Sequence, residues 1–167
     1  MAKYKVPALV YIKMEKPEGV YRFMAIQMNN LSTITTQLVK IEQMTRLINK
    51  FDLDMVSCLE VGTNWAQTPS SETLTSYFES EVFMRSVTGY NQNENASTKY
   101  QPGEAALLEV NEISEYCKKS GTDFRKLGRW SWFTLQGSPV HRTRIVSANH
   151  VGKAKLPGLQ IYYHQQR

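Results

Sequence analysis

Glu60 is the residue of this sequence whose type and position most clearly suggest chemistry. It directly follows an apolar run, Leu53 to Leu59, that has the length of a buried strand. A carboxylate in that place lies at the carboxyl edge of a sheet, where open α/β folds bind their ligands. Mg²⁺ binds oxygen ligands and keeps several water molecules, so one or two carboxylates can anchor it. Glu60 is therefore a candidate ligand for Mg²⁺ or Mn²⁺, although a strand-end glutamate can also be a plain surface or helix-capping residue.

Two neighbouring amides, Asn29 and Asn30, follow a second apolar run, Arg22 to Met28. If the two predicted strands are neighbours, these amides lie near Glu60 and could orient a phosphate or a ligand carboxylate. Asn-Asn after a strand is also a common turn sequence. The residues alone leave both interpretations open.

Charge is distributed unevenly along the chain. Residues 1–123 hold 12 Lys and Arg with all 15 Asp and Glu, a net −3, whereas residues 124–167 hold 8 Lys and Arg and no acid, a net +8. Aromatic rings are interleaved with these cations, and the segment includes Arg129, Trp130, Trp132, Arg142 and Arg144. Such a mixture is typical of nucleic-acid contact, with cations on phosphates and rings on bases. The alternative is a solvated face beside two core tryptophans.

The elements that would position these residues follow from hydrophobic spacing. Apolar side chains recur every three or four residues from Leu38 to Phe51, which predicts a helix that begins near Thr35. Strand, helix and strand then form a βαβ-like unit, although a further strand could lie between the two. A second helix is predicted after the Thr68-Pro69 cap, over about 69–83, and a loop over 91–103. Further strands are predicted at 105–110, 129–136 and 142–148, the last two as a hairpin, so the class is α/β (α+β).

The 167 residues suggest one domain, residues 20–167, preceded by a charged Pro/Gly linker within residues 1–19. No apolar run reaches the roughly 18–20 residues of a membrane span, and no secretory signal is visible, so we expect no membrane partner and an intracellular location, in the nucleus or cytoplasm. Cys58 and Cys117 are too isolated for a disulfide framework or a zinc site, and Cys58 is expected in the core.

Six segments, taken in order, resemble the endonuclease/exonuclease/phosphatase superfamily, in particular the endonuclease domain of retroelements. The resemblance covers about residues 20–167 and implies a partial two-sheet α/β sandwich of the DNase I-like type. Its strand ends would form a Mg²⁺ site that hydrolyses phosphodiesters of nucleic acid, with DNA favoured over RNA as the partner. The matching segments are Gln27 to Leu31, Asp52 to Glu60, Val61 to Trp65, Tyr100 to Leu107, Leu127 to Trp132 and Arg144 to Ala148.

The resemblance assigns roles position by position. Glu60 matches the metal ligand, and Asn29 matches the second polar position of the first turn. Gln27 stands where the family has an asparagine. It keeps the side-chain amide, but its side chain is one methylene longer, so the amide extends farther from the backbone. Asn149 and His150 follow the last strand, where the family commonly places a phosphate-facing tyrosine. The predicted nucleic-acid contacts are Asn64, Arg129, Trp130, Arg142, Arg144, Asn149 and His150.

The sequence differs from the family in the positions of its acidic residues. No Asp or Glu follows residue 123, so the later Asp-x-Asn and Asp-His motifs are absent. Glu104 adds a negative charge where many members have a second glycine. We therefore expect an N-terminal portion or truncated copy that is weakly active or inactive as a nuclease. The alternatives are a non-catalytic nucleic-acid-binding module that uses the basic, aromatic segment, and a degraded reading frame with no selected function.

Overall fold

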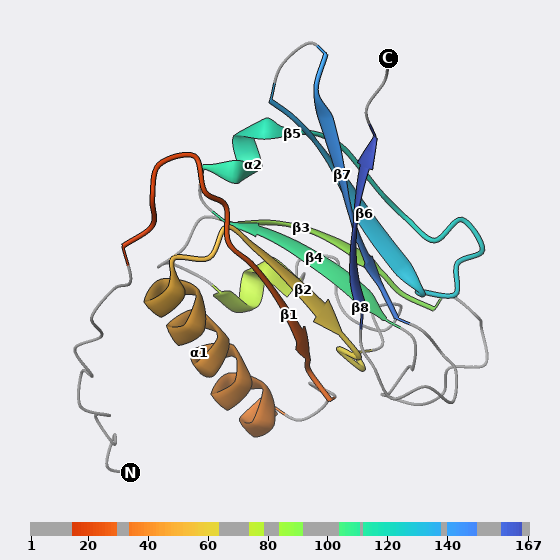
Figure 1. Ribbon diagram of the computed structural model, residues 1–167. Helices are drawn as coiled ribbons and strands as arrows, with labels where there is room; N and C mark the ends of the chain where they lie inside the picture. The colour runs from red at the N-terminus through yellow and green to blue at the C-terminus, as the bar shows by residue number, and fades with distance from the viewer. Residues whose placement is uncertain are drawn as a thin grey trace.

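The computed structural model describes residues 15–29, 34–63, 74–78, 84–91, 104–110, 112–137, 140–149 and 158–164. Over these residues the fold is mixed α/β, with two four-stranded sheets and few helices (Figure 1). This confirms the predicted fold class at the level of an α/β chain with two sheets. In chain order the elements are β1 (Phe23–Gln27), α1 (Ile34–Phe51), β2 (Met55–Leu59), η1 (Leu74–Phe78), β3 (Met84–Gly89), β4 (Ala105–Val110), α2 (Ile113–Tyr116), β5 (Cys117–Thr122), β6 (Trp130–Gln136), β7 (Arg142–Ala148) and β8 (Gly158–His164).

The first sheet has the strand order β1-β2-β4-β3. β1 and β2 are parallel neighbours, with Gln27 opposite Leu59, and α1 connects them. β4 is antiparallel to both β2 and β3. The predicted βαβ unit is confirmed, and no strand lies between its two strands. Their carboxyl ends therefore meet at one edge of the sheet.

The end of α1 explains how the chain turns so quickly into β2. The amide of Leu53 donates to the carbonyl of Ile48 at 3.0 Å, and Asp52 between them has φ 49°. This is the bonding pattern of a Schellman motif, which closes a helix with one left-handed residue. Ile48 and Leu53 are both buried. The same apolar pair that anchors the helix thus fixes the start of β2.

Two apolar layers hold the fold. All residues of β2 and β4 are buried, because one of their faces meets α1 and the other meets the second sheet. The α1 layer is centred on Met44, Ile48, Val56, Cys58, Leu74, Phe78 and Leu108. The layer between the sheets is centred on Met55, Leu107, Ile113, Phe133 and Ile145. The prediction that Cys58 lies in the core is confirmed.

The second sheet is an antiparallel meander in the order β5-β6-β7-β8. Gln136 pairs with Arg142, which confirms the predicted hairpin. Ser57 of β2 and Ser147 of β7 face each other between the sheets, with hydroxyl oxygens 2.6 Å apart. Figure 1 shows α1 on the side of the first sheet that faces away from this second sheet.

The helix predicted over about 69–83 is described only at residues 74–78, where Leu74–Phe78 form a short 3₁₀ helix, and strand β3 begins at Met84. Leu74 and Phe78, two residues of the predicted apolar face, are buried in the α1 layer. The cap at Thr68-Pro69 lies outside the described residues. Strands β3, β5 and β8 and helix α2 were not predicted.

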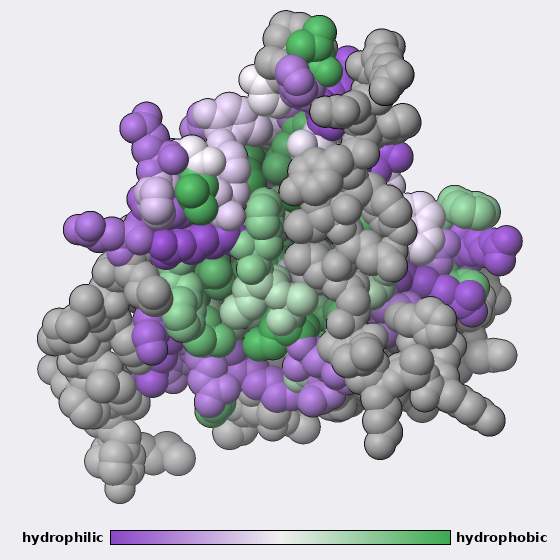
Figure 2. All heavy atoms as spheres, viewed as in Figure 1, coloured by the Kyte–Doolittle hydropathy of each residue, from purple (hydrophilic) through white to green (hydrophobic). Residues whose placement is uncertain are grey.

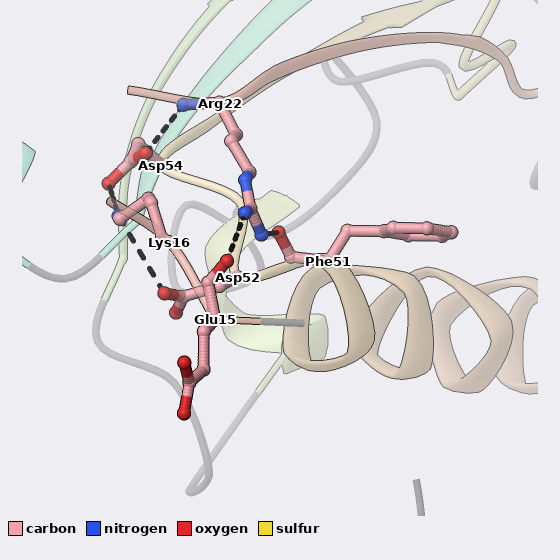
Figure 3. Close-up of polar contacts among 6 residues, drawn as sticks. All are labelled: Glu15, Lys16, Arg22, Phe51, Asp52 and Asp54. Atoms are coloured by element: carbon pink, nitrogen blue, oxygen red, sulfur yellow. Dashed lines mark hydrogen bonds and ion pairs between the residues drawn. The ribbon is translucent and has the colours of Figure 1, made fainter. Parts of the chain in front are cut away.

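A polar cluster fixes residues 15–22 to the turn between α1 and β2 (Figure 3). Asp54 accepts from Lys16 Nζ at 2.6 Å and from the amide of Arg22 at 2.7 Å. The Arg22 guanidinium donates to the carbonyls of Phe51 and Glu15, at 2.7 and 2.6 Å. Lys16, in the segment predicted as a linker, is thus bonded to the residue that precedes β2.

Strand β1 is an edge of the first sheet, and its apolar side chains are only partly covered. Figure 2 shows hydrophobic surface in the middle of the view, where β1 lies in Figure 1, with polar surface below it. Within the described ranges, no helix combines the length and the apolar content that crossing a bilayer requires.

Candidate functional site

The carboxyl ends of β1 and β2 bring two of the predicted site residues into contact. Gln27 Nε2 donates a hydrogen bond to Glu60 Oε2 at 2.5 Å. The pairing continues one step beyond β1, because the Met28 amide donates to the Leu59 carbonyl at 2.7 Å. Glu60 is half-buried and Gln27 is exposed, so the pair faces an accessible sheet edge.

The backbone leaves both strands through left-handed residues. Glu60 has φ 53° and Asn29 has φ 46°. Asparagine tolerates this conformation well, whereas a glutamate there is uncommon, and such outliers cluster at functional sites. Asn29 is exposed at the same edge, two residues beyond Gln27. The structure therefore brings Gln27 against Glu60 and leaves the Asn29 side chain at the rim.

Lys40 of α1 also belongs to this edge, and sequence reasoning missed it. Its Nζ donates to the carbonyls of Met28 and Asn29 at 2.6 and 2.7 Å. The helix that crosses over from β1 to β2 thus fixes the turn that follows β1. The only sequence signal was the position of Lys40 on the polar face of the predicted helix, which does not show what it bonds.

Glu104 forms hydrogen bonds with the segment that begins at Glu60. Its carbonyl accepts from the Glu60 amide at 3.0 Å, and its Oε2 accepts from the Thr63 amide at 3.0 Å. Burial raises the pKa of the Glu104 carboxyl from 4.5 to about 8, against the lowering effect of the Thr63 and Gly62 amides. The negative charge expected from the sequence is therefore wrong near neutral pH, since a fully buried carboxyl keeps its proton.

The donor set at this edge fits a magnesium ion that keeps most of its water. In the described part of the chain, no group of three or more His, Cys, Asp or Glu side chains is placed to hold a metal. Glu60 offers one carboxylate, and Gln27 occupies only its Oε2, so Oε1 can face an ion. Rotation of the Gln27 amide would present its oxygen instead of its nitrogen. Mg²⁺ commonly takes one or two carboxylates and several waters.

A small pocket of about 230 Å³ lies at the same end of the sandwich. Gly89, one of its lining residues, pairs with Ala105. Ala105 in turn pairs with Leu59, which precedes Glu60. Two strand spacings separate it from Glu60, or roughly 10 Å. Its lining includes Tyr90, Thr122, Phe124 and Lys126. Phe124 is 77% exposed.

The predicted basic and aromatic residues are partly gathered on the second sheet. Arg144 stacks over Trp132, with the guanidinium carbon 4.5 Å from the ring centroid. Trp130 lies 6.2 Å from the ring of Phe124, and Arg125 lies 5.6 Å above that ring. Two clusters of cation and ring therefore form, one on β6 and β7 and one in the turn before β6.

The other predicted contacts have varied placements. Arg142 and Arg129 are exposed, and Asn149 is half-buried with its amide bonded to the Arg129 carbonyl at 2.7 Å. The turn before Arg129 is held by Asp123, which accepts from the amides of Arg125 and Arg129 at 2.9 and 3.3 Å. Asn64 and His150 lie outside the described residues.

The chain matches no protein-family model and no curated protein sequence.

Proposed function

We propose that this chain carries a Mg²⁺-dependent phosphodiester-hydrolysing site of the endonuclease/exonuclease/phosphatase type, weakly active on nucleic acid. The observation that carries the proposal is the contact between Gln27 and Glu60 at the tips of two adjacent parallel strands. Ligands of open α/β sheets bind at this edge. Two sheets with α1 outside the first are compatible with the sandwich of that superfamily.

Each residue of the edge has a role in this proposal. Glu60 and Gln27 would hold the metal, which supplies charge stabilisation to the phosphate and the leaving oxygen. The exposed Asn29 amide would orient the phosphate, and Lys40 keeps its backbone turn in place. Glu104, neutral near pH 7, positions the loop of residues 61–63 without adding a repelling charge.

The expected rate is low. The chain has no acid after Asp123, so no histidine of the basic segment has an aspartate from that segment to orient it as a base. The attacking water would lack an activating group from that segment. General-base catalysis typically contributes about 10²–10⁴-fold, and we expect the activity to be lower by a factor of that order than in a site with such a pair.

Nicking of supercoiled plasmid DNA in Mg²⁺ tests the proposal. We expect slow nicking that chelation with EDTA stops and that Glu60→Ala abolishes. Glu42→Ala is the matched control, because Glu42 is an exposed glutamate of α1 paired with Arg46. Nicking that survives Glu60→Ala, or that both variants lose equally, would contradict the proposal.

A second candidate is favoured by the stack of Arg144 on Trp132. In this alternative the outer face of the second sheet binds nucleic acid without cleaving it. Binding of a labelled oligonucleotide would fall steeply with salt. Arg144→Gln would weaken it, the exposed control Lys50→Gln would not, and no nicking would accompany binding.

A further inference from the structure

A second pocket, of about 440 Å³, lies at the end of the sandwich opposite to Glu60. Its Arg85 pairs with Glu109, which in turn pairs with Met55 at the start of β2. Glu60 follows the other end of β2, beyond Leu59. The two ends of β2 are four residue steps apart, or about 13 Å. The pocket is thus distinct from the Glu60 edge.

The pocket forms where the edge strands β3 and β5 of the two sheets meet, and it is rich in hydrogen-bond donors. Among the described residues, three cationic and three hydroxyl side chains line it, and none of the described lining residues is an acid. The remaining walls are the partly buried Cys117 and the buried Phe133. The polar lining residues are Arg85, Lys118, Lys119, Thr75, Ser86 and Ser120.

A β-bulge explains how two consecutive lysines reach one pocket. Cys117 pairs with Leu135 and Lys119 with Thr134, so Lys118 is an extra residue in β5. Successive side chains of a regular strand point to opposite faces, whereas a bulge redirects one of them. Bulges are common beside binding sites for that reason. Lys118 and Lys119 can therefore act together with Arg85 of the facing edge.

A buried carboxyl lies behind these cations. Glu109 is fully buried, beside the Cys117 thiol and the Arg85 guanidinium. Burial raises its pKa to about 7, while the neighbouring Cys117 thiol and Arg85 guanidinium lower it by less. Near neutral pH a large fraction of Glu109 is uncharged. Arg85 lies beside this carboxyl and also lines the pocket.

We propose that this pocket binds the phosphate group of a small phosphate monoester. Arg85 supplies a planar fork of donors that matches phosphate oxygens, and Lys118 and Lys119 add point charges. The volume is within the range of small-molecule sites and exceeds that of a bare phosphate, so it leaves room for an attached group against Phe133. The charge of a monoester dianion suits three cations better than the single charge of an internal phosphodiester.

Titration of the full chain with AMP, adenosine and inorganic phosphate, followed by amide chemical shifts and calorimetry, tests this proposal. We expect AMP and phosphate to bind and adenosine not to bind. Arg85→Gln should weaken AMP binding by about tenfold, as expected for loss of a hydrogen bond to a charged group. Lys50→Gln, an exposed charge loss on α1, should leave it unchanged, and both variants should keep the wild-type melting temperature.

The outcomes separate this site from the Glu60 edge. Glu60→Ala should leave AMP binding intact, so a failure of plasmid nicking does not decide the matter. Absence of saturable AMP and phosphate binding would overturn the proposal, as would equal binding of adenosine. An oligonucleotide without terminal phosphates that binds as tightly as AMP and is equally weakened by Arg85→Gln would assign the pocket to the nucleic-acid backbone instead.

Discussion

The hydroxyl oxygens of Ser57 and Ser147 lie 2.6 Å apart in the buried layer between the two sheets. Ser57 belongs to β2, the strand that Glu60 follows, and Ser147 belongs to β7 of the second sheet. Both side chains are fully buried. This hydrogen bond is a direct polar link between the site-bearing sheet and the basic sheet.

Ser147→Ala should lower the free energy of unfolding by about 1–3 kcal/mol, because it leaves the Ser57 hydroxyl buried without a partner. The double variant Ser57→Ala/Ser147→Ala should cost less than the sum of the two single variants, since both partners are then gone. Urea unfolding of the four proteins measures this. Additive costs would show that the two hydroxyls do not depend on each other.

Stability should fall as the pH rises from about 5 to 8. The folded-state pKa of Glu104, about 8, is above its usual 4.5, so the folded protein binds more protons than the unfolded chain in this window. The stabilisation is fully present below pH 4.5 and is lost as the pH rises through about 8. Glu109 acts in the same direction, through about pH 7.

Glu104→Gln should therefore flatten the dependence of the urea midpoint on pH between 5 and 8, and adding Glu109→Gln should flatten it further. Glu42→Gln, at an exposed carboxylate, should leave the slope as in the wild type. A wild-type midpoint that does not change over this range would contradict the folded-state pKa values.

Asp54→Asn should destabilise the fold by about 1.5–3 kcal/mol, because the charged acceptor of both Lys16 and the Arg22 amide is lost. The control is Glu42→Gln, which removes an exposed ion pair with Arg46 and should cost at most about 0.5 kcal/mol. Thermal or urea unfolding compares the two. Equal costs would show that the cluster in Figure 3 is a surface feature only.

Gln27→Glu should make the response to Mg²⁺ larger. A second carboxylate against Glu60 repels it in the absence of metal and offers another oxygen ligand in its presence. The melting temperature in EDTA should fall, and the rise on adding Mg²⁺ should exceed that of the wild type. Asn49→Glu places the same charge on the exposed face of α1 and should show neither change.

The sequence could predict α1 from its single apolar face, and β2 and β4 from apolar runs that are buried on both faces. β1 and the hairpin of β6 and β7 were also predicted, and Glu60 followed from its place after β2. β5 could not be predicted, because Cys117–Thr122 is a mostly exposed edge strand without apolar alternation. The sequence also could not show that Arg85 lines the same pocket as Lys118 and Lys119, since this depends on two sheet edges meeting in space.

The same limit applies to the residues that support the site. Lys40 and Glu104 are ordinary charged residues in the sequence, and only the packing of α1 and β4 shows what they hold. Glu104 was expected to be charged because its type was known and its burial was not. The burial of Glu104 and the hydrogen-bond partners of both residues are properties of the fold, and they determine what Lys40 and Glu104 do.

Gly121 matters when homologues of this chain are compared, because of its neighbour Trp132. A β-carbon at this position would come within 2.8 Å of the Trp132 ring. A side chain at this position would require the Trp132 indole, on which Arg144 stacks, to shift. A homologue with another residue here would therefore need a different placement of that ring, which can be read from its sequence before any coordinates are known.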